Sequence, residues 1–168
     1  MKKWIYIMVI VVITIVATLS GISVYNKKQQ AAEFQEFDNY LQDDYYDLIV
    51  ECYDLFQAAA DANEDIELSE WAISEDGDMD SLKLQSRLYD IKEKLINKDL
   101  KYEDSLRLKK YALNIIEGSL KSTRLISAYA YEEDDYETSE EFDDLFSDSL
   151  DSTNKLLDKQ NALLDKYR

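Results

Sequence analysis

An uncharged apolar run near the N-terminus constrains this chain more than any other feature. Residues 4–25, WIYIMVIVVITIVATLSGISVY, comprise 22 residues without Asp, Glu, Lys or Arg. At about 1.5 Å per residue, a helix of this length extends roughly 33 Å, enough to cross a hydrocarbon core of about 30 Å. A single segment in lipid must satisfy its own backbone hydrogen bonds, so it can span only as a helix. The sequence therefore predicts a transmembrane helix that binds the bilayer through residues 4–25.

The residues that flank the run are typical of a signal anchor. Lys2 and Lys3 precede it, Lys27 and Lys28 follow it, and aromatic residues stand near both ends. A cleaved secretory signal is the alternative, but such signals have an apolar region of about 7–15 residues and a small-residue cleavage site. The lysines balance, and the N-terminal amine favours a cytoplasmic N-terminus. We expect a single-pass protein of the cell membrane with its C-terminal domain extracytoplasmic.

Composition restricts the rest of the chain to helices. Proline is absent and glycine occurs three times, whereas strands and turns usually need more of both. Histidine is also absent, which removes imidazole bases, Ser-His-Asp and Cys-His arrangements and the Glu-x-x-His di-iron pattern. No pair among the 36 acidic residues stands out as catalytic. We expect a protein that is not an enzyme and uses no cofactor.

Apolar residues recur at helical spacing in four stretches after residue 28. In the first, from about residue 30 to 60, the spacings alternate between three and four, a heptad-like pattern typical of coiled coils and bundles. This stripe consists of Phe34, Phe37, Leu41, Tyr45, Leu48, Cys52, Leu55 and Ala59, and is widened by Ile49 and Phe56. Nothing between Val24 and Phe34 breaks a helix, so we expect one rod that continues from the membrane span.

Three further helices are predicted. One begins at a cap formed by Asp78 or Asp80 and ends near residue 97, a second runs from about residue 102 to 129, and the last follows a capping box of Thr138 and Glu141. Their apolar positions are Leu84, Leu88, Ile91 and Leu95; Leu108, Tyr111, Ala112, Ile115, Ile116, Leu120, Leu125 and Ile126; and Phe142, Leu145, Phe146, Leu150, Leu156, Leu157, Leu163 and Leu164. We predict an all-α chain in which residues 1–28 form a signal-anchor with basic flanks. Residues 29–168 form an acidic antiparallel bundle of about four helices.

Charge is unevenly distributed along a chain whose net charge is −17. Residues 29–82 contain 17 acidic and no basic side chains, residues 83–124 contain 11 basic and 6 acidic ones, and residues 125–168 contain 13 acidic and 4 basic ones. Nucleic-acid binding needs the opposite sign and is excluded. The pattern predicts that the basic middle helices neighbour the acidic ones. Each exposed ion pair contributes only about 0–1 kcal/mol, so apolar burial dominates stability.

Tyrosines set among acidic residues form the candidate partner-binding surface. The residues are Tyr40, Tyr46, Tyr53, Tyr131 and Tyr136. Such a surface suits a basic, aromatic-rich protein or a glycan. In the alternative interpretation, tyrosines fill the shoulders of a bundle with the ring inward and the hydroxyl in water.

Three other features have structural interpretations. Residues 76–80, DGDMD, resemble the start of a calcium loop, but its sixth position is Ser81 and its twelfth is Arg87, so a helix-capping loop is the preferred interpretation. Cys52 is the single cysteine and is expected to be buried rather than to form an intermolecular disulfide. Gly118 lies inside a predicted helix, where Gly costs about 1 kcal/mol relative to Ala, so we expect a neighbouring helix to approach closely there.

These features favour a membrane-anchored, non-enzymatic interaction module, more in keeping with a bacterial surface than with a eukaryotic secretory one. It would expose an acidic, tyrosine-rich surface at the outer face of the membrane and bind another protein, possibly a basic one. One alternative is a divalent-cation-responsive or cell-wall-facing sensor, whose melting temperature would depend on calcium or magnesium. A second alternative is an inhibitor or immunity-type protein that masks a basic partner.

Overall fold

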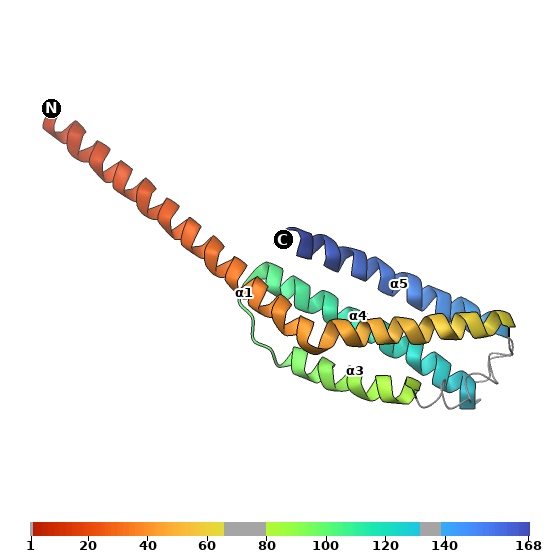
Figure 1. The fold of residues 1–168 in the computed structure, drawn as a ribbon. Helices are drawn as coiled ribbons and strands as arrows, with labels where there is room; N and C mark the ends of the chain where they lie inside the picture. The colour runs from red at the N-terminus through yellow and green to blue at the C-terminus, as the bar shows by residue number, and fades with distance from the viewer. Residues whose placement is uncertain (1, 66–79, 132–138) are drawn as a thin grey trace.

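Four helices make up the computed structural model in the part of the chain that it describes (Figure 1). They are α1 (Lys2–Asp65), α3 (Asp80–Ile96), α4 (Glu103–Tyr131) and α5 (Ser139–Asp165). The structure describes the backbone of residues 2–65, 80–131 and 139–168, and the side chains of residues 23–61, 80–128 and 144–168. These residues contain no strand, so the prediction of an all-α chain is confirmed.

The helices pack as an antiparallel bundle, as predicted. Successive helices run in opposite directions, and α4 packs against each of the other three (Figure 1). Two ion pairs show that α1 and α3 are antiparallel. Lys94, near the end of α3, pairs with Asp44 of α1. Arg87, nearer the start of α3, pairs with Glu51, which lies further along α1. Acidic α1 therefore neighbours basic α3, which agrees with the segregation of charge in the sequence.

The core consists of the apolar stripes that the sequence predicts. All ten residues predicted to face the core from α1 are buried, and so are the four predicted in α3. In α4 seven of the predicted positions are buried, and Tyr111 packs against the core while partly exposed. In α5, Phe146, Leu163 and Leu164 are buried, whereas the other described leucines are half-buried. Helical spacing alone thus identified the residues that stabilise the bundle.

Small and polar residues pack between α4 and α5. Ser122 and Ser149 are buried and their hydroxyls lie 2.9 Å apart, while Thr153 donates to the carbonyl of Ser149 within its own helix. A Cβ atom built on Gly118 would collide with Oγ1 of Thr153 and lie 3.3 Å from its Cβ. The prediction of a close helix approach at Gly118 is confirmed. The hydroxyl layer itself could not be predicted from the apolar pattern, because Ser and Thr do not contribute to that pattern.

Aromatic side chains fill the space between α1 and α5. The rings of Phe34 and Tyr167 stack with their centroids 3.9 Å apart, and the rings of Phe56 and Phe146 meet edge to face at 5.8 Å. Tyr45 reaches from α1 to Gln160 of α5, with 3.4 Å between its hydroxyl and Oε1. The large residues of the α1 stripe therefore join the first and last helices.

The N-terminal part of α1 projects beyond the bundle as a continuation of the same helix (Figure 1). The prediction that one rod continues from residues 4–25 into the bundle is confirmed for the backbone. Within the residues whose side chains are described, no helix is long and apolar enough to cross a membrane. Apart from residues 23–25, the predicted span lies outside those residues, so the transmembrane helix stays a prediction.

The observed helix ends agree with the predicted ones to within a few residues. Helix α3 begins at Asp80, one of the two predicted caps, and α4 begins and ends within two residues of its expected limits. Residues 66–79 and Thr138 lie outside the described residues. The interpretation of residues 76–80 as a helix-capping loop rather than a calcium loop and the capping box before α5 therefore stay predictions.

Candidate functional site

A line of acidic side chains covers the outer face of α1. Glu36, Asp43, Asp47, Asp54 and Asp61 follow one another at intervals of seven or four residues, which places them on one side of the helix. All five are exposed, and none forms an ion pair with a described basic side chain. We call these five residues the acidic face. It lies opposite the stripe that α1 buries.

Helix α5 adds a second acidic line beside this face. Asp144, Asp151, Asp158 and Asp165 are exposed and spaced seven residues apart. Asn154 lies between two of them on the same side of α5, and it accepts a hydrogen bond from α1. The seam between α1 and α5 is therefore bordered by aspartates on both sides.

Two of the predicted partner-binding tyrosines, Tyr46 and Tyr53, lie along this seam. The Tyr53 hydroxyl donates to Oδ1 of Asn154 at 2.7 Å, and the Tyr46 hydroxyl donates to Oδ1 of Asp38 at 2.8 Å. Both rings are half-buried. Burial raises the pKa of each phenol, and the neighbouring carboxylate of Asp38 raises that of Tyr46 further. Both tyrosines are therefore neutral at physiological pH and present a ring edge and a hydroxyl among acids.

Tyr40 lies on the opposite shoulder of α1, towards α3. Its ring packs beside Phe37 and lies under the ammonium of Lys98, which is 4.5 Å from the ring centroid. It also lines a hollow of about 210 Å³ between α1 and α3, together with Asp43 and Lys94 among others. The structure therefore separates Tyr40 from the seam that contains Tyr46 and Tyr53.

The remaining predicted site residues, Tyr131 and Tyr136, lie outside the residues whose side chains are described. The three described tyrosines are all half-buried, as the shoulder-filling interpretation expects, and two of them also border the acidic face. The grouping of these acids into one face was not among the predictions from the sequence. The seven-residue spacing of Asp47, Asp54 and Asp61 was the signal that could have revealed it.

A hollow of about 330 Å³ opens between α1 and the C-terminal end of the chain. It is lined by Phe34, Gln35, Asp38, Asn39, Gln42, Leu164, Tyr167 and Arg168. Its lining is mostly polar, with amides, a carboxylate and the guanidinium of Arg168 beside the apolar side chains of Phe34 and Leu164. Such a hollow can receive one side chain of a partner protein that has both an aliphatic stem and a polar end.

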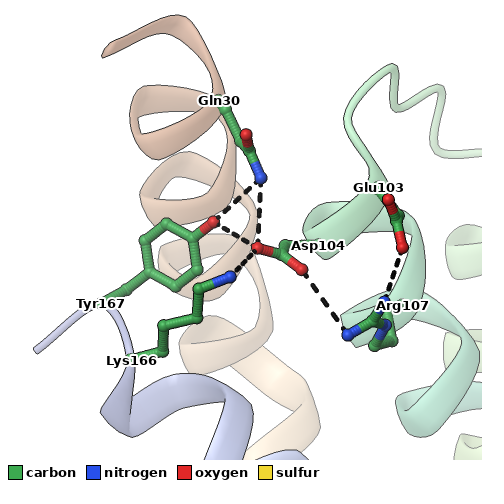
Figure 2. A network of polar contacts seen from close by, with 6 residues as sticks. All are labelled: Gln30, Glu103, Asp104, Arg107, Lys166 and Tyr167. Carbon is green, nitrogen blue, oxygen red and sulfur yellow. Dashed lines mark hydrogen bonds and ion pairs between the residues drawn. The ribbon is translucent and has the colours of Figure 1, made fainter. Parts of the chain in front are cut away.

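The most connected polar cluster lies where α1 joins the bundle (Figure 2). Asp104, only 4% exposed, accepts hydrogen bonds at Oδ2 from Lys166 and Tyr167 at 2.6 Å and from Gln30 at 3.1 Å. Arg107 approaches its other oxygen at 3.8 Å. The cluster joins α1, the start of α4 and the C-terminal residues after α5. Its donors satisfy a buried carboxylate, which indicates a structural clamp rather than a reactive group.

Electrostatics in this cluster follow from these contacts. Hydrogen bonds from Lys166 and Tyr167 hold the pKa of Asp104 below its usual value, because both stabilise the carboxylate. Burial and the hydrogen bond to Asp104 raise the pKa of Tyr167 to about 12. Burial opposes ionisation of nearby Glu33, but backbone N–H groups, led by that of Tyr102, lower its pKa overall. Both carboxylates are therefore charged over the physiological range.

Cys52 is fully buried in the core, which confirms the prediction that it acts as a small apolar residue. Burial raises the pKa of its thiol to about 12, so it is not a reactive thiolate. In the part of the chain that the structure describes, no group of three or more acidic or cysteine side chains is placed to hold a metal ion.

Comparison with family models, with curated proteins and with solved structures finds no match for this chain.

Proposed function

We propose that this protein is a membrane-anchored, non-enzymatic helical interaction module that binds another protein through the acidic face and the neighbouring α1–α5 seam. The observation that carries the proposal is the acidic face itself. Five exposed carboxylates lie on one side of α1 without a described basic partner, although the same bundle pairs other acids of α1 with α3. A basic partner would relieve this concentration of like charge and would be attracted to it over a distance.

The seam supplies contacts that charge alone does not. Tyr46 and Tyr53 offer half-buried aromatic surface with polar ends, the kind of residue that contributes strongly at interfaces. The hollow of about 330 Å³ that Asp38 lines, the acceptor of the Tyr46 hydroxyl, can receive an anchoring side chain. The acidic face would attract the partner over a distance, and the residues of the seam would make the direct contacts that bind it.

Membrane anchoring is the second part of the proposal. It is supported by the uncharged run of residues 4–25 and by the continuity of α1 from Lys2 to Asp65. We expect the N-terminus in the cytoplasm and the bundle outside. Protease treatment of intact cells tests the topology, because an external bundle is degraded and a cytoplasmic one is protected.

Affinity capture from membranes tests partner binding. Full-length protein is captured in detergent at low and at high salt, beside the variant Asp47→Asn/Asp54→Asn. We expect a partner that is retained at low salt, released at high salt and lost with the variant. The matched control Asp90→Asn/Glu93→Gln removes the same charge from exposed positions of α3 and should retain it.

Two outcomes contradict the proposal. Recovery of no partner at either salt concentration would leave the acidic face without a function in binding. Equal loss of the partner from both variants would show that total charge matters and that the acidic face does not.

A further inference from the structure

The end of the bundle nearest the N-terminal rod is built from three segments. The connection between α3 and α4 folds against α1, since the backbone N–H groups of Lys101 and Tyr102 each donate to Glu33 at 3.0 Å. The residues after α5 close over the same place through Asp104 and Gln30 (Figure 2). We call residues 23–30, 96–107 and 166–168 together the anchor-proximal end.

This end has a different charge from the rest of the bundle. Within these ranges seven basic residues outnumber three acidic ones. Asp104 is buried against its donors, whereas Asp99 and Glu103 are exposed and Glu103 pairs with Arg107. The exposed bases are Lys27, Lys28, Lys101, Arg107, Lys166 and Arg168. Lys27, Lys28 and Lys101 form no ion pair among the described residues. An acidic domain therefore presents a basic end.

Two exposed apolar side chains of the bundle lie at the same end. They are Ile96 at 54% and Leu106 at 46%, and they lie on the segments that pack beside the exposed end of the predicted span, Val24 at 56% and Tyr25 at 62%. Basic residues interspersed with exposed apolar ones are typical of surfaces that rest on a membrane. The acidic face lacks such basic residues, although the exposed Val50, at 59%, lies beside it between Asp47 and Asp54.

The length of α1 places this end close to the predicted membrane surface. The predicted span ends at Tyr25, and Gln30 is the first α1 residue that bonds to the other helices. Five helical residues extend about 7.5 Å. The headgroup layer on each side of a bilayer is of similar thickness, about 5–7 Å.

We propose that the anchor-proximal end lies on anionic lipid headgroups, with its lysines and arginines against the phosphates and its exposed apolar residues at the boundary with the acyl chains. This inference rests on the membrane anchoring in the proposed function and is independent of the protein partner. The contact fixes the orientation of the bundle, so that the acidic face stands away from a surface of its own sign.

A fluorescent probe on a single introduced cysteine tests the contact. Asp99→Cys lies in the α3–α4 connection, Asp61→Cys lies at the far end of the bundle, and Cys52 is buried in the core and protected from labelling. The labelled full-length chains are reconstituted into phosphatidylcholine vesicles, with or without phosphatidylglycerol, that carry a headgroup quencher. We expect quenching several-fold stronger at position 99 than at position 61, and stronger still with phosphatidylglycerol.

A charge-matched pair of variants shows whether the basic residues are responsible. Lys28→Gln/Lys101→Gln should abolish the phosphatidylglycerol-dependent part of the quenching at position 99. Lys121→Gln/Lys155→Gln removes the same charge from exposed positions elsewhere on the bundle and should leave it unchanged. Equal helical content by circular dichroism establishes that all variants are folded.

Flotation of the vesicles separates this inference from the proposed function. If the chain does not float with them, the anchor is wrong and the headgroup contact is wrong with it. If the chain floats but phosphatidylglycerol has no effect, or positions 99 and 61 are quenched equally, only the headgroup contact is overturned. Neither result bears on partner capture by the acidic face.

Discussion

At the scale of single residues, packing between α4 and α5 depends on the missing side chain of Gly118. A helix interior disfavours glycine by about 1 kcal/mol relative to alanine. The chain tolerates this cost because Oγ1 of Thr153 occupies the space that a Cβ would need, while donating to the carbonyl of Ser149 at 2.9 Å. Close packing at this point therefore outweighs helix propensity.

Gly118→Ala tests that balance. We expect the substitution to lower the free energy of unfolding by up to about 2 kcal/mol, because overpacking costs about 1–3 kcal/mol and improved propensity recovers about 1 kcal/mol. Thr153→Ala removes the obstructing hydroxyl, so the double variant should be more stable than the sum of the two changes predicts. Chemical denaturation of the wild type, the two single variants and the double variant gives the coupling energy between the two positions. Additive effects, or a stabilised Gly118→Ala protein, would contradict this account of the packing.

Asp104 is the residue whose charge most directly joins the helices. Hydrogen bonds to charged groups contribute about 1.5–3 kcal/mol each, so Asp104→Asn should lower the free energy of unfolding at pH 7 by about that amount. Asp99→Asn, at an exposed neighbouring position, should change it by about 0.5 kcal/mol or less.

The pH dependence of this difference follows from the lowered pKa of Asp104. A carboxyl group with a lower pKa in the folded state stabilises the fold above its unfolded pKa, about 3.9, and that contribution disappears as the pH falls through the folded pKa. The gap between wild type and Asp104→Asn should therefore be constant near neutrality and narrow below about pH 4. Denaturation curves of both proteins between about pH 7 and about pH 3 measure this difference in the free energy of unfolding. A difference that grows as the pH falls would contradict a lowered pKa of Asp104 in the folded state.

At the scale of elements, the last residues of the chain fasten α5 to the two helices beside it. Tyr167 stacks on Phe34 of α1 and donates to Asp104 of α4, so one side chain completes contacts with both. Tyr167→Ala should cost about 2 kcal/mol through loss of the ring contact and the hydrogen bond. Tyr167→Phe keeps the ring contact and should cost about 1 kcal/mol.

Amide hydrogen exchange locates this effect. In Tyr167→Ala, exchange should accelerate in the last turn of α5 and the first turn of α4, while the middle of α3 is unchanged. Uniform acceleration across the bundle would show instead that Tyr167 contributes only to global stability.

Much of this architecture could be predicted from the sequence because each helix carries its own signal. Spacings of three and four residues, with Ile49 and Phe56 beside them, identified every position that is buried among the described side chains of α1, and the absence of proline left the helix unbroken. Contacts made by polar residues far apart in sequence could not be predicted in this way. The Gln30–Asp104–Tyr167 cluster brings together residues separated by 74 and 63 positions, and no local pattern pairs them.

At the scale of the whole molecule, the grouping of charge into faces emerges only when the helices are assembled. The sequence predicted which segments are acidic and which are basic. Assembly divides those charges further, since Asp44 and Glu51 are paired with α3 while Asp47 and Asp54 are left on the outer face. Tyr40 was predicted to share a surface with Tyr46 and Tyr53, but the rotation of α1 places it on the opposite shoulder.

The response of the whole bundle to salt follows from this arrangement. Raising sodium chloride from about 0.1 M to about 1 M shortens the Debye length from about 10 Å to about 3 Å. This change weakens the ion pairs of α1 with α3, whose side chains are 40–67% exposed, but it also screens repulsion within the acidic face. The two effects oppose each other, and the buried apolar stripes, which supply most of the stability, respond little.

We therefore expect the melting temperature of the full chain in detergent to change by no more than about 5 °C over this range, which corresponds to roughly 1 kcal/mol for a domain of this size. Arg87→Gln removes the ion pair between Arg87 and Glu51. Salt then has fewer attractive ion pairs to weaken but still screens repulsion within the acidic face, so added salt should raise the melting temperature of this variant more than that of the wild type. A fall of more than about 10 °C for the wild type would show that ion pairs, rather than apolar burial, hold α1 against α3.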